Sequence, residues 1–144
     1  MELENFFPYE LAVAAARMSR QLEAVYSKDG GLSREEWRVL FLLAGVTELT
    51  SKELSRRSSL DKVQISRAAK RLEEKGHIVG TESKIDRRLR DYACTDQGKA
   101  FFQSLFPKVN SKAEMVFGLM DPDDLDALRR GVNGLTKATE DLGL

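Results

Sequence analysis

The segment from Thr50 to Gly98 constrains the fold of this 144-residue chain more than any other part of it. Thr50 is a typical helix-capping residue, and the polar sequence after it predicts a short helix over residues 52–57. A polar turn separates this helix from a second one, predicted over residues 62–75 and stopped by Gly76, a residue common just after helix ends. Two helices joined by a tight turn predict a helix-turn-helix.

A basic β-hairpin is predicted directly after the second helix. Strand-like runs cover residues 78–82 and 89–94, and a charged turn over residues 84–88 joins them. A hairpin in this place makes the winged form of the helix-turn-helix, which suits a DNA duplex better than a small substrate. The first interpretation is therefore a DNA-binding regulator.

The distribution of charge supports a nucleic-acid partner, although the chain as a whole is formally neutral. Residues 51–90 contain 12 Lys and Arg against 6 Asp and Glu, a local charge of +6, which leaves −6 on the remaining residues. Basic charge concentrated in one segment is the pattern expected of a surface that binds phosphates. We therefore expect double-stranded DNA as the partner.

Length and composition indicate a soluble globular protein. A chain of 144 residues with 42% hydrophobic and 32% charged residues is expected to form one unit. Within it, we expect a winged-helix DNA-binding lobe over residues 33–98 and a helical dimerisation lobe from residues 1–30 and 99–144. The single cysteine, Cys94, rules out an internal disulfide and suits a reducing cytoplasm. With no secretory signal or membrane span in the sequence, we predict a cytoplasmic protein without a membrane partner.

Amphipathic helices are expected before the helix-turn-helix. Apolar residues at helical spacing predict one helix over about residues 8–28. Ser33 and Glu36 form a predicted capping box, in which each side chain would bond the backbone of the other residue. This box opens a helix that carries Trp37 and ends near Gly45. Because that helix is apolar almost all round, it should be central to the core.

Helices are also expected after Gly98, with a kink or a break at Pro107. Asp121 as capping residue and Pro122 at the first position open the last helix. The expected fold class is therefore mainly α with a small β-hairpin wing. The outer helices carry more apolar surface than one small winged lobe can cover, so we expect a homodimer with a shared helical base, which would match a palindromic DNA site. A monomer with these helices folded onto its own core is the alternative.

The second helix of the helix-turn-helix has two different faces at 100° per residue. One side carries apolar residues that should pack against the Trp37 helix, namely Ile65, Ala68, Ala69 and Leu72. The opposite side and its flanks present residues that can contact base edges in a major groove, namely Lys62, Val63, Gln64, Ser66 and Arg67. Val63 is informative, because an apolar side chain on the face opposite the core would be exposed to solvent unless it contacts a partner. A merely solvated face is the alternative.

Contacts with the DNA backbone are expected from polar and basic residues around this helix, namely Thr50, Ser51, Lys52, Lys70, Arg71 and Arg87. At the hairpin tip, Asp86 and Arg88 are two residues apart, so in an extended strand they point the same way and can pair. A carboxylate that holds a guanidinium at the tip would prepare it for a narrow minor groove. A surface salt bridge of no importance is the alternative.

The same residues resemble a known family. The wing resembles the MarR family signature of Asp-x-Arg, five residues, Leu-Thr, two residues and Gly, which here reads Asp86-Arg87-Arg88, Cys94-Thr95 and Gly98. Residues 37–40 resemble the core of that family's second helix, and residues 61–67 with 71–76 resemble its recognition helix. The resemblance covers about residues 33–98. It implies a dimeric bacterial regulator, usually a repressor, whose helical base dimerises and often binds a small aromatic or phenolic ligand.

The wing departs from the family pattern at two places. Cys94 stands where the family usually has Leu, and Arg90 and Asp91 stand where it usually has apolar strand residues. By strand parity Arg90 shares a face with Tyr92 and Cys94. Either the wing is less well packed than usual, or Arg90 has an acidic partner.

Other chemistries have weaker support in the sequence. No hydroxyl has a visible base partner, so we expect no catalytic residues and no enzyme activity. His77, the only histidine, has no second His or Cys nearby at the spacing of metal ligands, so we predict no metal site and no cofactor. Cys94 is expected to be a small apolar strand residue rather than a redox sensor. Trp37 is expected in the core, with the wall of a ligand pocket as its alternative role. The competing class of protein is a winged interaction module without specific DNA binding.

Overall fold

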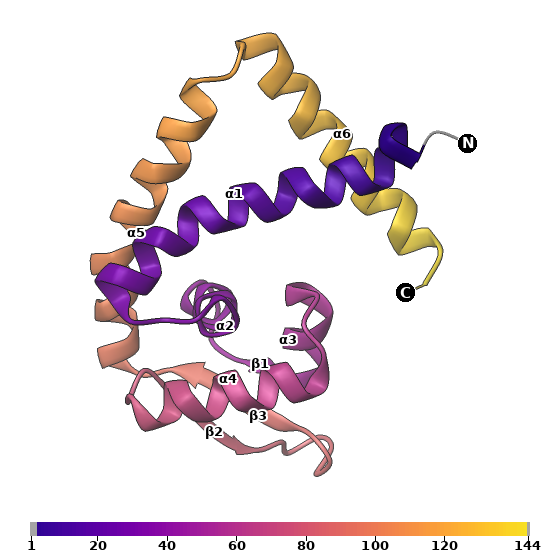
Figure 1. The fold of residues 1–144 in the computed structure, drawn as a ribbon. Coiled ribbons are helices and arrows are strands. Elements are labelled where there is room, and N and C mark those ends of the chain that lie inside the picture. The colour runs from indigo at the N-terminus through magenta and orange to yellow at the C-terminus, as the bar shows by residue number, and fades with distance from the viewer. Residues whose placement is uncertain (1–2, 144) are drawn as a thin grey trace. The chain divides into compact units, whose positions relative to one another are not determined.

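The computed structural model describes residues 3–143, and Figure 1 shows their fold. The chain divides into two compact units, the first ending at Val109 and the second beginning at Asn110. The predicted helical lobe includes residues 1, 2 and 144, which lie outside the described residues.

Helices make up most of the described chain. In chain order the elements are η1 (Leu3–Asn5), α1 (Phe7–Gly30), α2 (Arg34–Ala44), β1 (Leu49–Thr50), α3 (Ser51–Ser58), α4 (Lys62–Glu74), β2 (Ile78–Glu82), β3 (Arg90–Cys94), α5 (Asp96–Gly118) and α6 (Pro122–Asp141). The predicted fold class, mainly α with a small β-hairpin wing, is confirmed.

The sheet is antiparallel and has the strand order β1-β3-β2. β2 and β3 form the predicted hairpin, in which Ile78 lies opposite Cys94. The sequence does not predict β1, because two residues are too few to show an alternating pattern. Leu49 of β1 pairs with Tyr92 of β3, and both side chains are buried, so β1 ties the hairpin to the start of α3.

α2 forms the centre of the first unit, as its apolar sequence predicts. Val39, Leu40 and Leu43 of α2 are fully buried. α1 contacts α2 on one side, and α4 and the sheet contact it on the other (Figure 1). The predicted orientation of α4 is confirmed, because the four residues predicted on its inner face are all buried, namely Ile65, Ala68, Ala69 and Leu72.

Stacked aromatic rings join three helices of the first unit. Trp37 of α2 stacks on Tyr26 of α1, with ring centroids 5.1 Å apart, and on Phe102 of α5 at 5.6 Å. Such pairs contribute about 0.5–1.5 kcal/mol each beyond the burial of their surface. Trp37 is only 8% exposed, so it is a core residue, as expected.

The start of α2 departs from the predicted capping box. The Ser33 hydroxyl accepts the Glu36 N–H at 3.1 Å, which confirms one half of the box. The Glu36 carboxylate does not return to Ser33: it is 4% exposed and accepts a bond from Lys75 Nζ at 2.6 Å. Lys75 also donates to the Gly31 carbonyl at 2.9 Å. A buried carboxylate needs a partner, and here it joins α2 to the end of α4.

α5 is continuous, so of the two expectations at Pro107, a kink or a break, the break is wrong. The helix begins at Asp96, before Gly98, and runs through Pro107 to Gly118. Proline removes only one backbone hydrogen bond. Leu105 and Val109, on either side of Pro107, are buried against the core and hold the helix together there.

His77 packs between the end of α4 and the start of α5. Its ring is buried and stacks on Phe101 with centroids 4.2 Å apart, and its Nδ1 has no hydrogen-bond partner among the described residues. Burial, followed by the nearby Lys75 ammonium, lowers the pKa of His77, while Glu36 opposes this shift. The folded protein therefore disfavours the protonated ring.

We expect the His77→Phe variant to be less sensitive to mild acid than the wild type. Because the folded-state pKa of His77 lies below the unfolded value of about 6.5, the unfolded chain binds the proton first as pH falls. The stability that the neutral ring contributes is fully present above about pH 6.5 and is lost as pH falls toward the folded pKa. Urea unfolding at pH 7.5 and 5.5 should show a loss for the wild type and a smaller one for the variant. Equal losses would contradict this role.

The second unit contains the end of α5 and all of α6. Asp121 caps α6 by accepting the Asp123 N–H at 2.8 Å, and Pro122 is the first helical residue, as predicted. Leu128, Val132 and Leu135 of α6 remain 41–47% exposed. Their spacing of four and three residues places them on one face of the helix.

Candidate nucleic-acid interface

Two capping boxes define the helix-turn-helix. Thr50 and Glu53 form one at the start of α3, and Asp61 and Gln64 form the other at the start of α4. The turn between them contains Ser59 in the left-handed region, with φ of 57°. These local bonds set where α4 begins, so they position its first turns.

The outer face of α4 is exposed as predicted. Val63 is 55% exposed although it is apolar, and the side chains that surround it are also exposed, namely Lys62, Ser66, Arg67, Lys70 and Arg71. Gln64 differs from them, because its side-chain oxygen accepts the Asp61 N–H at 3.0 Å and completes the cap. The face therefore offers cations, hydroxyls and one exposed apolar side chain around a fixed helix start.

The wing tip is held by its own hydrogen bonds. The buried hydroxyl of Ser83 accepts the N–H groups of Ile85 at 3.3 Å and of Asp86 at 3.4 Å. Arg88 donates to Asp86 through Nε at 3.0 Å and Nη2 at 2.9 Å, so the predicted pair is confirmed. The pair lies in the turn before β3 rather than in an extended strand, and the Arg88 backbone N–H also donates to Asp86 at 3.0 Å.

The charge pair at the tip presents its cation to solvent. The two side-chain bonds from Arg88, followed by its backbone bond, lower the pKa of Asp86, so its carboxylate stays ionised to a lower pH than an ordinary aspartate. The Arg88 side chain is 87% exposed. Arg87 is even more exposed, and its Nε lies 3.8 Å from a Glu82 oxygen. A bidentate carboxylate therefore orients Arg88, whereas Arg87 is held only loosely.

Arg90 has partners other than the acidic side chain that was one of the two expectations for the wing. Its Nη2 donates to the Gly80 carbonyl at 2.9 Å, and its guanidinium carbon lies 5.9 Å from the centre of the Tyr92 ring. Among the described residues it forms no ion pair with an acidic side chain. Tyr92 beneath it is buried, and burial raises the pKa of its hydroxyl, while the nearby Arg90 guanidinium opposes this shift. Arg90 itself is exposed, and its ordered contacts are with Gly80 and Tyr92.

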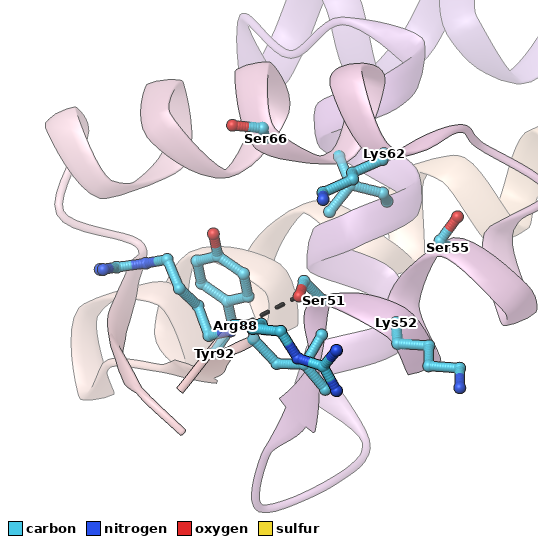
Figure 2. A pocket seen from close by; sticks show the side chains of 10 residues that line it. Ser51, Lys52, Ser55, Lys62, Ser66, Arg88 and Tyr92 are labelled. Atoms are coloured by element: carbon cyan, nitrogen blue, oxygen red, sulfur yellow. Dashed lines mark hydrogen bonds between the residues drawn. The ribbon is translucent and has the colours of Figure 1, made fainter. Parts of the chain in front are cut away.

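A groove of about 330 Å³ lies between α3, α4 and the wing (Figure 2). It is lined by residues of all three, namely Ser51, Lys52, Ser55, Lys62, Ile65, Ser66, Arg88, Leu89, Arg90 and Tyr92. In Figure 2, Lys62 and Ser66 extend from α4, Ser51 and Lys52 from α3, and Arg88 and Tyr92 from the hairpin. The fold therefore brings together five residues predicted for three different kinds of DNA contact.

Five of the ten lining residues are absent from the DNA contacts predicted from the sequence, namely Ser55, Ile65, Leu89, Arg90 and Tyr92. Ser55 lies on α3 and donates to the Leu60 carbonyl at 2.6 Å, so it also fixes the turn. The sequence could have pointed to Arg90, because a charged residue stands at a strand position where an apolar one was expected. Strand alternation predicts that Arg90 lies on the same face as Tyr92. That α3 and α4 lie beside this face is seen only in the tertiary structure.

Trp37 and Cys94 lie outside this groove. Trp37 borders a separate hollow of about 280 Å³, together with Arg38, Phe41, Leu42, Arg57 and Ser58. Arg38 also donates to the Ser58 carbonyl at 3.3 Å. Cys94 is half-buried, and burial raises the pKa of its thiol, with Lys99 opposing. A raised pKa disfavours the reactive thiolate, in keeping with an apolar packing role for Cys94.

The capped helix pair, the exposed face of α4 and the clamped wing define a winged helix-turn-helix DNA-binding protein. Within residues 3–143, no helix is both long enough and apolar enough to span a bilayer.

Comparisons with known proteins agree with this class. A model of the MarR family matches residues 30–89. The HTH-type transcriptional regulator SarZ of Staphylococcus aureus (strain MRSA252) is 28% identical over 112 residues, which are 78% of this chain and 75% of SarZ. The family model and this relative support a MarR family winged-helix transcriptional regulator.

Two solved structures share the whole fold. Sco3205, a MarR family regulator from Streptomyces coelicolor solved in complex with DNA, has a TM-score of 0.83 at 20% identity, covering 96% of this chain and 89% of its own. BpsR of Bordetella bronchiseptica, whose DNA binding is regulated by 6-hydroxynicotinic acid, has a TM-score of 0.81 at 15% identity, covering 94% and 96% of the two chains.

Proposed function

We propose that the protein is a repressor that binds a palindromic operator as a homodimer and is released by a small aromatic ligand. The observation that carries the DNA-binding part is the groove in which the outer face of α4 and the clamped Arg88 meet. A helix that reads bases and a wing that carries an oriented cation are the two parts that a winged protein places in adjacent grooves.

Each predicted residue has a role in this proposal. Base edges in the major groove would be contacted from the first turns of α4 by Lys62, Val63, Gln64, Ser66 and Arg67. Phosphates would be contacted by Thr50, Ser51, Lys52, Lys70, Arg71 and Arg87. Arg88, oriented by Asp86, would enter the minor groove beside them.

A homodimer would cover the apolar surface that one copy leaves exposed. On α6, Leu128, Val132 and Leu135 form an apolar face that needs a partner in water. In this proposal a winged lobe over residues 33–98 binds DNA, and residues 1–30 and 99–144 dimerise. The two-fold axis of such a dimer would match a palindrome whose half-sites lie about one duplex turn apart.

The hollow beside Trp37 is the candidate position for a ligand. Trp37 and Phe41 offer aromatic surface there, and Arg38 and Arg57 offer positive charge. A ligand bound in the hollow releases DNA only if it binds the DNA-free conformation more tightly than the DNA-bound one. The regulation of BpsR by 6-hydroxynicotinic acid is a precedent on the same fold, and it concerns that protein.

Selection from genomic DNA tests the proposal directly. Purified protein is bound to random genomic fragments at rising salt, and the fragments retained at high salt are sequenced. A shared palindrome with half-sites about one turn apart would support a specific dimeric regulator. Binding that fades with salt and leaves no common sequence would instead favour the interaction-module alternative.

We expect Arg88→Ala to reduce operator affinity roughly tenfold, mainly on sites with A·T-rich flanks. The reason is that a narrow A·T minor groove has a strong negative potential, which an oriented cation can use. Titrations with A·T-rich and G·C-rich flanks measure the effect. Arg87→Ala is the matched control, since a phosphate contact should weaken both sites alike. An Arg88→Ala variant with unchanged affinity would remove the wing from the proposal.

A further inference from the structure

The groove between α3, α4 and the wing contains a cation on strand β3. Arg90 lines the groove together with Lys52, Lys62 and Arg88. Nothing in the predicted set of DNA contacts assigns it a role. An added cation in a surface of this charge is unfavourable unless an anion binds there.

Two contacts hold Arg90 in place and leave much of its guanidinium available. One donor bonds the Gly80 carbonyl at 2.9 Å on the neighbouring strand, and the group lies 5.9 Å from the centre of the Tyr92 ring. An arginine has five N–H donors in a planar fork. The Gly80 bond uses one of them, so the contact fixes the direction of the side chain without exhausting its bonding capacity.

The other lining residues also suit an oxygen-rich anion. Three serines join the four cations, namely Ser51, Ser55 and Ser66, and no Asp or Glu lines the groove. The Ser55 hydroxyl donates its proton to the Leu60 carbonyl at 2.6 Å, so Ser51 and Ser66 are the serines that can donate to an anion. Figure 2 shows Ser55 on α3 and Ser66 on α4, whereas Ser51 of α3 lies beside the hairpin, where its hydroxyl accepts the Arg90 N–H at 3.5 Å. Glu73 lies near Tyr92 but forms no ion pair with Arg90 among the described residues. Cations and hydroxyls without a competing carboxylate are the partners that phosphates find in proteins.

The place of the groove in the fold identifies where such a phosphate comes from. If α4 enters a major groove and the wing enters the adjacent minor groove, the sugar–phosphate strand that separates the two grooves must pass between these elements. The groove lies there, between α4 and the hairpin. Its volume of about 330 Å³ gives a phosphodiester and part of a sugar room to enter.

We propose that this groove seats one phosphate of the DNA backbone and that Arg90 is a ligand of that phosphate. The inference rests on the proposed placement of α4 and the wing on DNA. Arg90 contributes affinity that does not depend on base sequence, because a phosphate carries no base information.

The experiment compares Arg90→Met, which removes the charge and keeps the length, with Arg90→Lys, which keeps the charge. Affinity for the selected operator and for random duplex DNA is measured over a range of salt concentrations. Loss of one phosphate contact in each half-site should reduce the slope of log K against log salt by about 1.8 for Arg90→Met, at about 0.9 per contact. Arg90→Lys should retain most of the slope. Arg34→Met, at the start of α2 and outside both the groove and the proposed dimerisation segments, is the matched control and should leave the slope unchanged.

A second measurement locates the phosphate. Single phosphates of the operator are replaced in turn by neutral methylphosphonates. One position in each half-site should weaken binding by the wild type and leave binding by Arg90→Met almost unchanged, because the contact is already missing in the variant.

The possible failures are distinguishable. If the wild type binds random DNA but selects no operator, the proposed regulator fails, and the slope on random DNA still decides the role of Arg90. If the wild type selects an operator and Arg90→Met keeps the full slope, the phosphate contact is overturned and the regulator stands. If Arg90→Met has a lower melting temperature but an unchanged slope of log K against log salt, Arg90 contributes only to the packing of the wing. That result would also overturn the proposal. A wild type that binds no DNA would overturn both.

Discussion

Replacing Gly98 with alanine is expected to lower the free energy of unfolding by about 3 kcal/mol. Gly98 lies in the first turn of α5, and an added Cβ would overlap the His77 carbonyl oxygen and lie 2.8 Å from its carbon. The His77 carbonyl cannot easily move, because it accepts the Thr95 N–H at 3.0 Å. The Thr95 hydroxyl in turn accepts the Gly98 N–H at 2.9 Å. The substitution therefore strains the joint between β2 and α5.

Urea unfolding at a fixed protein concentration measures this loss, since dimerisation would make stability depend on concentration. Gly45→Ala is the matched control. Gly45 follows α2 with φ of −98°, which alanine adopts readily, and an added Cβ would have nothing within 4 Å. We expect this control to stay within about 0.5 kcal/mol of the wild type. Equal stability of the two variants would contradict the close approach at Gly98.

Replacing Arg67 with alanine is expected to relax the base preference at one position of each half-site. Arg67 is exposed on the outer face of α4, one turn after Val63. An arginine can pair with guanine through two hydrogen bonds, and its loss should cost roughly 1–3 kcal/mol per half-site against the preferred base. Competition between the selected operator and versions changed at single positions measures the discrimination.

Lys70→Ala provides the comparison on the same helix. Lys70 is also exposed, but it lies in the second half of α4, where a phosphate is the expected contact. This variant should weaken binding to all sequences alike and reduce the salt slope. If Arg67→Ala behaves in the same way, Arg67 contacts phosphate rather than a base, and the assignment of the reading face must move toward the start of the helix.

The helices and the wing could be predicted because their signals are local. The Asp61 cap, the four inner residues of α4 and the Asp86–Arg88 pair all depend on residues a few positions apart. Hydrogen bonds and periodic faces at such distances follow from the geometry of a helix or a turn. The sequence therefore determined the winged architecture, the orientation of α4 and five of the ten residues that line the groove.

Other features depended on parts of the chain that meet only after folding. Glu36 pairs with Lys75, 39 positions away, instead of completing a local cap. Pro107 stays inside α5 because buried neighbours hold the helix on both sides of it. The sequence shows Arg90 only as an unexpected charge in a strand, whereas the tertiary structure shows that it lines a groove with residues of α3 and α4. Tertiary structure decided these three points, because the energy of a buried charge, a tolerated proline or a shared anion site comes from contacts between distant segments.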